Sequence, residues 1–398
     1  MSIETIGGLA IIATVDPLFR YARQKQNQIV ALIQEFVECE SPSSDAASVN
    51  RFVDLFVESV RDIARPKTLP GGRFGKHLRC EFVLPGSNKT GSNKRGQILA
   101  LGHSDTVWPL GTLSSMPFRR ARGRLWGPGV FDMKAGLAFF IFAMRTLRDL
   151  EIPVNRKVVL QINSDEEVGS PSSRPLTEEA ARRSMAVLVL EPGTGLEGKL
   201  KTARKGVGDY KITVHGRASH AGVDFAAGAN AIVEMSRQLE RIAAFTRLDR
   251  GVTVSPGVIH GGTRSNVVAA ACTAEVDVRI PRQSDQRYLA RRFASLTPFD
   301  NRCSIEVSGG INRPPLERNE GVRKLFRLAR SLSAEMGVNL EESSTGGGSD
   351  GNFTAALGVP TLDGLGAVGE GAHAANESIL IDRIADRTAL LAKLVARL

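Results

Sequence analysis

Apolar positions along the first half of the chain follow two different spacings. Gln24–Glu40 and Lys134–Leu150 repeat them at helical intervals, whereas Gln97–Gly102, Lys157–Asn163 and Ala186–Leu190 are short continuous apolar runs. Continuous runs of this length are typical of strands that are covered on both faces, as in a parallel sheet. Strands separated by helices predict an α/β layered domain with a mostly parallel sheet.

The pattern changes after about residue 204. Strand-like and helix-like stretches follow in the order strand, helix, strand, strand, helix, strand, which is the order of a ferredoxin-like unit. The six stretches are Gly208–Val214, Ala227–Phe245, Thr253–His260, Ala269–Ile280, Gln283–Ser295 and Ser304–Val307. Two helical stretches, Gly321–Met336 and Asp382–Leu398, then complete the chain. We therefore expect one discontinuous domain, residues 1–204 and 312–398, with residues 205–311 inserted as a second domain.

Composition supports a globular protein of two domains. The chain has 398 residues, of which 42% are apolar and 24% charged, so a disordered or collagen-like protein is excluded. Its longest apolar run, Gly7–Val15, is too short to cross a bilayer and has no basic segment before it. The four cysteines are scattered, which favours reduced thiols and a cytoplasmic protein without a membrane partner.

The net charge of +10 does not alter the prediction of a globular protein with two domains. It is typical of a solvated surface, and no basic stripe with interleaved aromatic residues supports nucleic-acid binding. The arginines at 119, 120, 122 and 124 leave open a steering role for polyanionic substrates.

Acidic residues and histidines gather at the ends of the predicted strands, where α/β folds place their sites. They occur in the stretches His103-Ser-Asp105, Asp132-Met-Lys, Asp165-Glu166-Glu167, Glu191-Pro and Gly-Ala-His373. Each alone has a simpler explanation, such as a polar turn for His-x-Asp or a helix N-cap for Asp132. Together, two imidazoles and three carboxylates without a thiolate suit two Zn²⁺ ions, or Co²⁺ or Mn²⁺ in their place.

The five motifs, in this order and with the inserted unit, resemble the di-zinc metallopeptidase family. That family includes aminoacylases, acetylornithine deacetylase, succinyl-diaminopimelate desuccinylase and glutamate carboxypeptidases of the carboxypeptidase G type. The resemblance extends over nearly the whole chain from about Ile29. It is strongest to the glutamate carboxypeptidases, in the stretches HSDTVWPLGTLSSMPFR, GPGVFDMKAG and TGGGSD. It implies a zinc-peptidase domain with a ferredoxin-like lid and dimerisation domain.

The resemblance also implies a role for each motif residue. His103, Asp132 and Glu191 would hold one zinc, and Asp132, Glu167 and His373 the other, with two zinc ions per subunit. Asp105 would orient His103, and Glu166 would be the general base. A cis peptide bond is implied between Asp132 and Met133.

Residues outside the metal motifs are implied in substrate binding. His220 and Asn266 would act in the active site of the partner subunit of a homodimer, although a lone histidine at a turn is more often structural. Lys199, Arg279 and Arg313 would surround the carboxylates of a C-terminal glutamate, while a solvated Lys199 is the simpler alternative. Gly347, in the Gly-rich stretch, would let the main chain approach the ligand.

These expectations lead to a homodimeric di-zinc amidohydrolase. It would release a C-terminal amino acid, glutamate above all, from an N-acyl, peptidyl or folyl conjugate that carries a C-terminal carboxylate. The alternatives are an N-acyl-amino-acid deacylase of the same family and a non-catalytic member that binds metal or peptide.

Overall fold

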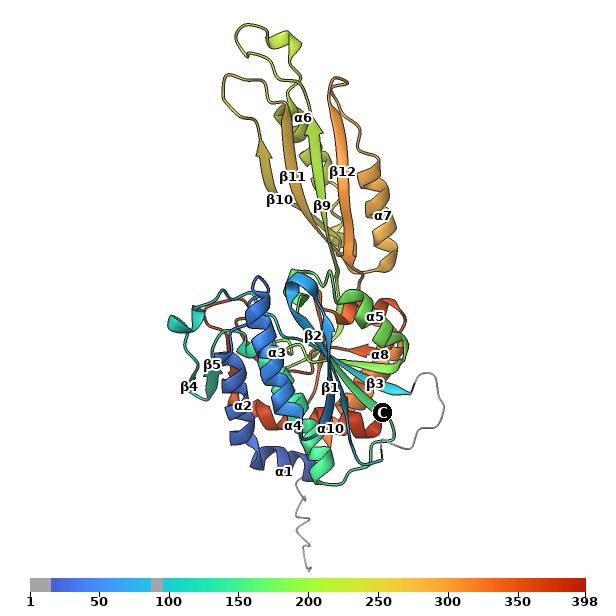
Figure 1. Ribbon diagram of the computed structural model, residues 1–398. Coiled ribbons are helices and arrows are strands. Elements are labelled where there is room, and N and C mark those ends of the chain that lie inside the picture. The colour runs from blue at the N-terminus through green and yellow to red at the C-terminus, as the bar shows by residue number, and fades with distance from the viewer. Residues whose placement is uncertain (1–15, 87–95) are drawn as a thin grey trace, which may run out of the picture.

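The computed structural model describes residues 16–86 and 96–398, and it shows a layered body from which a second, elongated sheet projects (Figure 1). The apolar run Gly7–Val15 lies outside the described residues. None of the helices in the two described ranges combines the length and the apolar composition that crossing a membrane requires.

A six-stranded sheet forms the centre of the body, in the order β1-β2-β6-β3-β7-β14. Its strands are β1 (Ala64–Pro70), β2 (Lys76–Phe82), β6 (Lys157–Asn163), β3 (Gln97–His103), β7 (Ser184–Val189) and β14 (Thr361–Leu362). The pairs β6–β3, β3–β7 and β7–β14 are parallel, which confirms the predicted α/β fold with a mainly parallel sheet. The antiparallel hairpin β1–β2 at one edge was not predicted, because β1 is a mostly exposed edge strand without apolar alternation.

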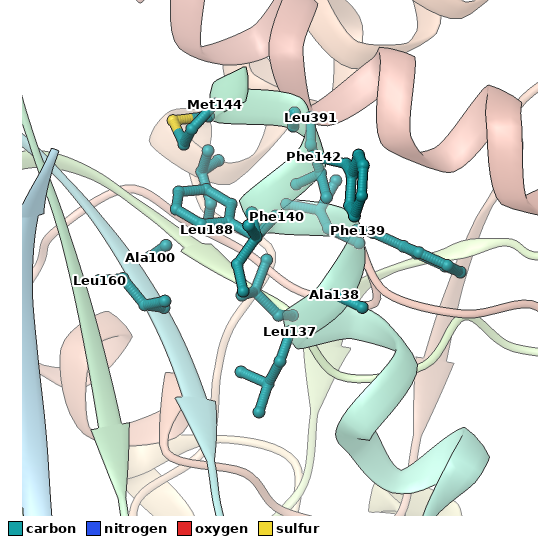
Figure 2. Packing of buried hydrophobic residues seen from close by; sticks show 14 of the residues in the cluster. Ala100, Leu137, Ala138, Phe139, Phe140, Phe142, Met144, Leu160, Leu188 and Leu391 are labelled. Atoms are coloured by element: carbon teal, nitrogen blue, oxygen red, sulfur yellow. The ribbon is translucent and has the colours of Figure 1, made fainter. Parts of the chain in front are cut away.

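Helix α4 (Ala135–Asp149) is buried on nearly every side because it lies between this sheet and the outer helices. Figure 2 shows Leu137, Phe140 and Met144 of α4 among residues of the strands β3, β6 and β7 and Leu391 of α10. The other helices of the body are α1 (Pro17–Gln24), α2 (Gln26–Glu38), α3 (Ala46–Val60), α5 (Arg174–Arg182), α8 (Glu320–Ala334), α9 (Gly351–Ala356) and α10 (Ile384–Arg397).

The projecting part is a four-stranded antiparallel sheet in the order β10-β11-β9-β12. Its elements are β9 (Gly206–His215), α6 (Ala231–Ala243), β10 (Thr253–Gly261), β11 (Ala271–Ile280), α7 (Gln283–Ala294) and β12 (Ser304–Arg313). The order of elements and the strand order are those of a ferredoxin-like unit. Alternate residues of β11 are buried in a core shared with α6 and α7, and the intervening residues carry the charged side chains of the opposite face.

Short strands complete the body. β8 (Leu200–Arg204) pairs with β13 (Glu342–Thr345), and a small sheet joins β4 (Arg119–Ala121), β5 (Arg124–Trp126), β16 (Ser378–Leu380) and β15 (Gly369–Glu370). The small sheet brings residues near 126 beside residues near 378, and this pairing places the segment that leads to Asp132 near the segment that follows His373.

Candidate metal centre

Three neighbouring parallel strands end at the same edge of the central sheet, and each is followed by motif residues. His103 is the last residue of β3, Glu166 and Glu167 follow β6, and Glu191 follows β7. Asp132 lies between Gly129 and α4, where its backbone is not helical and its peptide bond to Met133 is cis, as the resemblance implies.

Two clusters of ligand atoms form at this edge and share the Asp132 carboxylate. In the first cluster, the His103 Nε2 atom is 3.1 Å from Asp132 Oδ1 and 3.5 Å from Glu191 Oε1. In the second, the His373 Nε2 atom is 3.5 Å from Asp132 Oδ2 and 3.3 Å from Glu167 Oε2. Within each cluster all ligand atoms lie within 4.8 Å of one another. The structure thus brings together the five residues named as metal ligands.

The donor atoms fit divalent cations. The His103 Nδ1 atom is 2.8 Å from the Asp105 carbonyl oxygen and donates to it, so Nε2 is the ring nitrogen that faces the carboxylates and would bind a metal ion. The Glu167 Oε1 atom is buried and has no hydrogen-bond partner among the described residues. Imidazole and carboxylate donors without a thiolate suit zinc and similar ions.

The pKa shifts show how strongly the clusters favour positive charge. Burial would raise the pKa of Asp132, yet the imidazoles of His103 and His373 hold it well below its usual range. Hydrogen bonds to Asp132 and Glu167 raise the pKa of His373 to about 10. Burial would lower the pKa of His103, but Asp132 and Glu191 raise it well above its usual value. Protonated imidazoles compensate the carboxylates here, and bound cations would compensate them equally.

Asp105 holds this edge of the sheet through a different atom from the one expected. Its backbone carbonyl oxygen contacts His103, while its carboxylate lies 3.6 Å from that ring. The carboxylate instead accepts hydrogen bonds from the Ser43 hydroxyl and from the backbone N–H groups of Glu166 and Glu167. Asp105 therefore connects His103 to the segment that carries the two glutamates.

Glu166 lies beside the clusters and is held by an arginine. Its Oε1 atom accepts a hydrogen bond of 2.9 Å from Arg313, whose other terminal nitrogen donates to Asp350 at 2.7 Å. Burial raises the pKa of Glu166 well above its usual value, although the Arg313 charge opposes this. A carboxyl group with a raised pKa can both accept and return a proton near neutral pH.

The other predicted substrate residues lie apart from the clusters. The Lys199 ammonium pairs with Glu341 at 2.8 Å. Arg279 pairs with Asp277 and donates to the Gly346 carbonyl at 3.4 Å, next to Gly347. The Gly347 carbonyl accepts from Arg204, which links the Gly-rich loop to the site.

His220 and Asn266 lie on adjoining loops of the second domain, where the Ala221 N–H donates to the Asn266 carbonyl. The His220 Nδ1 atom accepts from the N–H groups of Gly222 and Val223, so Nε2 is the ring nitrogen that carries a proton. The loop follows β9, at the end of the projecting sheet that is remote from the body (Figure 1). The structure does not bring these residues to the clusters of their own chain.

Sequence reasoning missed a carboxylate that fixes the Asp132 segment. The Glu377 side chain is fully buried and accepts four hydrogen bonds. Its Oε1 atom accepts from the N–H groups of Phe131 and Asp132, and its Oε2 atom accepts from Gly129 N–H and Trp108 Nε1. The only signal in the sequence was its position four residues after His373 and directly before an apolar strand.

Arg204 and Asp363, which the sequence analysis also did not identify, support Glu191. Arg204 is buried, forms two 2.8 Å hydrogen bonds to the Asp363 carboxylate, and lies 3.3 Å from Glu191 Oε2. It was overlooked because an arginine at the end of a short strand has no pattern that distinguishes it from a surface cation.

Comparison with known proteins agrees with this geometry. The chain is 28% identical to carboxypeptidase G2 of Pseudomonas sp. (strain RS-16) over 387 residues, covering 95% of the chain and 91% of that protein. It is 31% identical to succinyl-diaminopimelate desuccinylase of Cereibacter sphaeroides over 309 residues, covering 71% and 78% respectively.

A solved structure shares the fold. The crystal structure of aminopeptidase PepT from Bacillus cereus superposes with a TM-score of 0.77 at 21% identity, covering 93% of the chain and 98% of that structure. Residues 99–397 match the sequence profile of peptidase family M20/M25/M40. The chain therefore belongs to peptidase family M20/M25/M40, a family of metal-dependent hydrolases.

Proposed function

We propose that the protein is a two-metal amidohydrolase that releases a C-terminal glutamate from an N-acyl, peptidyl or folyl conjugate. The observation that carries this proposal is the Asp132 carboxylate, which has one oxygen in each ligand cluster while Glu166 lies beside both. Residues arranged in this way suit hydrolysis of an amide by activated water.

The proposed metals are two zinc ions, with Co²⁺ or Mn²⁺ as substitutes. His103, Asp132 and Glu191 would hold one ion, and Asp132, Glu167 and His373 the other. When bound, such ions lower the pKa of a water molecule and polarise the amide carbonyl.

Glu166 moves the proton in this proposal. Arg313 holds its Oε1 atom, so Oε2 is the atom that accepts the proton of the attacking water. The same oxygen then returns the proton to the leaving nitrogen, which makes Glu166 the base and afterwards the acid. Because Arg313 is engaged with Glu166 and Asp350, we propose that it positions Glu166 rather than binding substrate.

Recognition of the released amino acid is assigned to the charged face of β11 and the Gly-rich loop. Arg279 lies on that face and donates to the Gly346 carbonyl, and in this proposal its guanidinium would bind an α-carboxylate beside Gly347. Lys199 would supply the second cation for a glutamate side chain after leaving Glu341.

A homodimer would bring His220 and Asn266 to the partner's site. The second domain exposes apolar side chains that a partner could cover, namely Val223, Phe225, Ile232, Val233, Leu248, Val258 and Ile259. Strand β10 is also an open edge of the sheet. Mixing inactive His220→Ala and Glu166→Gln subunits should restore up to about a quarter of the activity if half of the protein forms heterodimers, each with one intact site. No recovery after proven subunit exchange would contradict the proposed cross-subunit role.

The second candidate is an N-acyl-amino-acid deacylase, which the similarity to a desuccinylase favours. Metal-loaded protein should be compared on N-acylglutamates and on N-acyl derivatives of other amino acids, with a chelated control. Faster release of glutamate supports the proposal, and indifference to the C-terminal residue supports the deacylase. A purified, metal-loaded protein without turnover on either set would support a non-catalytic member.

Glu166→Gln tests the proposed mechanism. We expect kcat to fall by about 10²–10⁴-fold, because the proton transfer is lost, while bound metal stays unchanged. Glu58→Gln, at an exposed position of α3, is the matched control and should retain full activity. A Glu166→Gln protein with normal kcat would refute the assignment of the base.

A further inference from the structure

A cavity of about 220 Å³ lies on one face of the central sheet, where β1, β2, β3, β6 and the end of α5 line it. We call it the basic cavity. Strands β3 and β6 begin beside it, at Gln97 and Lys157, and they end at the metal centre. Lys157 and Asn163 mark the two ends of β6, and a strand of this length spans roughly 20 Å. The lining contains none of the residues assigned above to metal binding, proton transfer or substrate recognition.

The strand register gathers charged side chains on this face of the sheet. Arg65 of β1 is opposite Glu81 of β2, and Lys67 is opposite Arg79. Directly opposed residues of paired strands point to the same face, as do residues two apart on one strand. Glu81 is in turn opposite a residue of β6 that packs against α5, so the four side chains share the face that α5 covers in part.

The basic cavity carries more positive than negative charge. Five basic residues line it, namely Arg65, Lys67, Arg79, Lys157 and Arg183. Glu81, the one acidic residue of the described lining, pairs with Lys157, and Glu179 nearby pairs with Arg183 at 2.6 Å. The side chains of Arg65 and Lys67 have no hydrogen-bond or ion-pair partner within residues 16–86 and 96–398. Two cations therefore remain uncompensated at the cavity.

Lys67 and Arg79 oppose each other with like charges. Directly opposed side chains of an antiparallel pair have Cβ atoms about 4.5–5.5 Å apart, and like charges at that separation are destabilising. The Arg79 guanidinium donates through Nη2 to the Gln161 side chain at 2.9 Å, but its buried Nε atom has no acceptor in the described part of the chain. A buried donor without an acceptor is also costly. An anion bound between Lys67 and Arg79 would reduce both costs.

We propose that the basic cavity binds a small ligand of the phosphate class, with Arg65, Lys67 and Arg79 as its donors. These cations come from two strands, and Lys157 and Arg183 add charge from β6 and from the end of α5. Donors on several sides suit a tetrahedral oxyanion better than a planar carboxylate, which one guanidinium fork can satisfy. The volume is below the range of about 300–1,000 Å³ that is usual for drug-sized ligands, and it suits a phosphate or diphosphate group.

Calorimetry with inorganic diphosphate tests the proposal on the metal-free protein, with a chelator present so that bound metal does not hold the anion. We expect one diphosphate to bind per chain. Lys67→Met should weaken binding about tenfold, because it removes one charge-assisted hydrogen bond. Lys324→Met, at an exposed position of α8, is the matched control and should bind as the wild-type protein does. Absence of binding, or equal weakening in both variants, would overturn the proposal.

Thermal unfolding gives a second reading of the same site. Without an anion, Lys67→Met should raise the melting temperature by about 1–2 °C, because the repulsion from Arg79 is lost. Diphosphate should raise the melting temperature of the wild-type protein, since a ligand of the native state stabilises it, and it should raise that of Lys67→Met much less. Equal shifts in both proteins would place the anion elsewhere and would contradict the proposal.

The class of ligand is tested with glycerol 3-phosphate and succinate, which both carry about two negative charges at neutral pH. Glycerol 3-phosphate should compete with diphosphate at least about tenfold better than succinate, and equal competition would refute the phosphate class. Vesicles that contain phosphatidic acid and a single-stranded oligonucleotide present phosphates on larger partners. Binding of either one through Lys67, without binding of free diphosphate, would overturn the assignment to a small ligand. None of these measurements needs turnover, so their outcome does not depend on the proposed hydrolysis.

Discussion

The two ligand clusters share Asp132 but differ in how the chain holds them. His103 ends a central strand, its side chain is 1% exposed, and the Asp105 carbonyl fixes its ring. His373 lies in a loop, its side chain is 49% exposed, and its own φ is +61°. The first cluster is thus part of the packed interior, whereas the second is completed by a surface loop. The Asp132 carboxylate thus joins a ligand cluster that the protein core holds in place to one that depends on the contacts of a loop.

The difference between the two clusters is tested most directly by removing each imidazole from the metal-free protein. His103→Ala should lower the free energy of unfolding by about 3–5 kcal/mol, because Asp132 and Glu191 then lose the buried imidazole that lies between them. His373→Ala should cost less than about 1 kcal/mol, because solvent screens a half-exposed group. Urea unfolding with a chelator present measures both values at neutral pH. Equal losses would show that the two clusters are held alike.

A smaller effect is expected from the contact that ties the His373 loop to Asp132. In Glu377→Gln, an amide NH₂ in place of Oε2 would face the N–H donors of Gly129 and Trp108, so the side chain at 377 would lose two of its four hydrogen bonds. Metal affinity should fall about 10–100-fold, as is usual when a group that orients ligands is changed. Competition with a chelator measures this. Glu370→Gln, which affects an exposed pair with Arg124, is the control and should bind metal normally.

Trp108→Phe gives the smallest effect of this series. It keeps the ring but removes the Nε1–H that donates to Glu377, so the loss should be about tenfold or less in metal affinity. Combined with Glu377→Gln it should add little, because both changes break the same contact. Full additivity would argue against a common role for the two residues.

The sequence predicted the buried parallel strands from continuous apolar runs and the longer helices of the body from apolar residues at helical intervals, whereas the short helices α1, α5 and α9 were not predicted. Lys157–Asn163 was predicted to the residue, and the other central strands differ by one or two residues. The hairpin β1–β2 and the pair β8–β13 were missed because polar side chains dominate these strands. Their pairing depends on neighbours distant in the sequence, which periodicity does not reveal.

The motif residues were found because strand ends and acidic runs are visible in a single sequence. The residues that support them were not. Glu377 and Arg204 act through backbone donors and a distant aspartate, and a lone buried charge has no local pattern. The sequence likewise could not show that His103 contacts the Asp105 carbonyl and not its carboxylate. That choice depends on the hydrogen bonds that the carboxylate makes to residues distant in the sequence, such as Glu166.

Two buried arginines, Arg204 and Arg313, bind the base of the second domain to the body. Within residues 16–86 and 96–398, two strands connect the body to the second domain, and each has a buried arginine beside the connection: Arg204 just before β9 and Arg313 at the end of β12. Their head groups are anchored on Asp363 and Asp350, both inside the body. Lys205 and Asn312, the next residues towards the second domain, are also hydrogen-bonded to the body, so any rotation of the second domain would have to bend the chain beyond them. Such a rotation would leave Glu166 and Glu191 in place, because Arg313 and Arg204 would stay bound to the body.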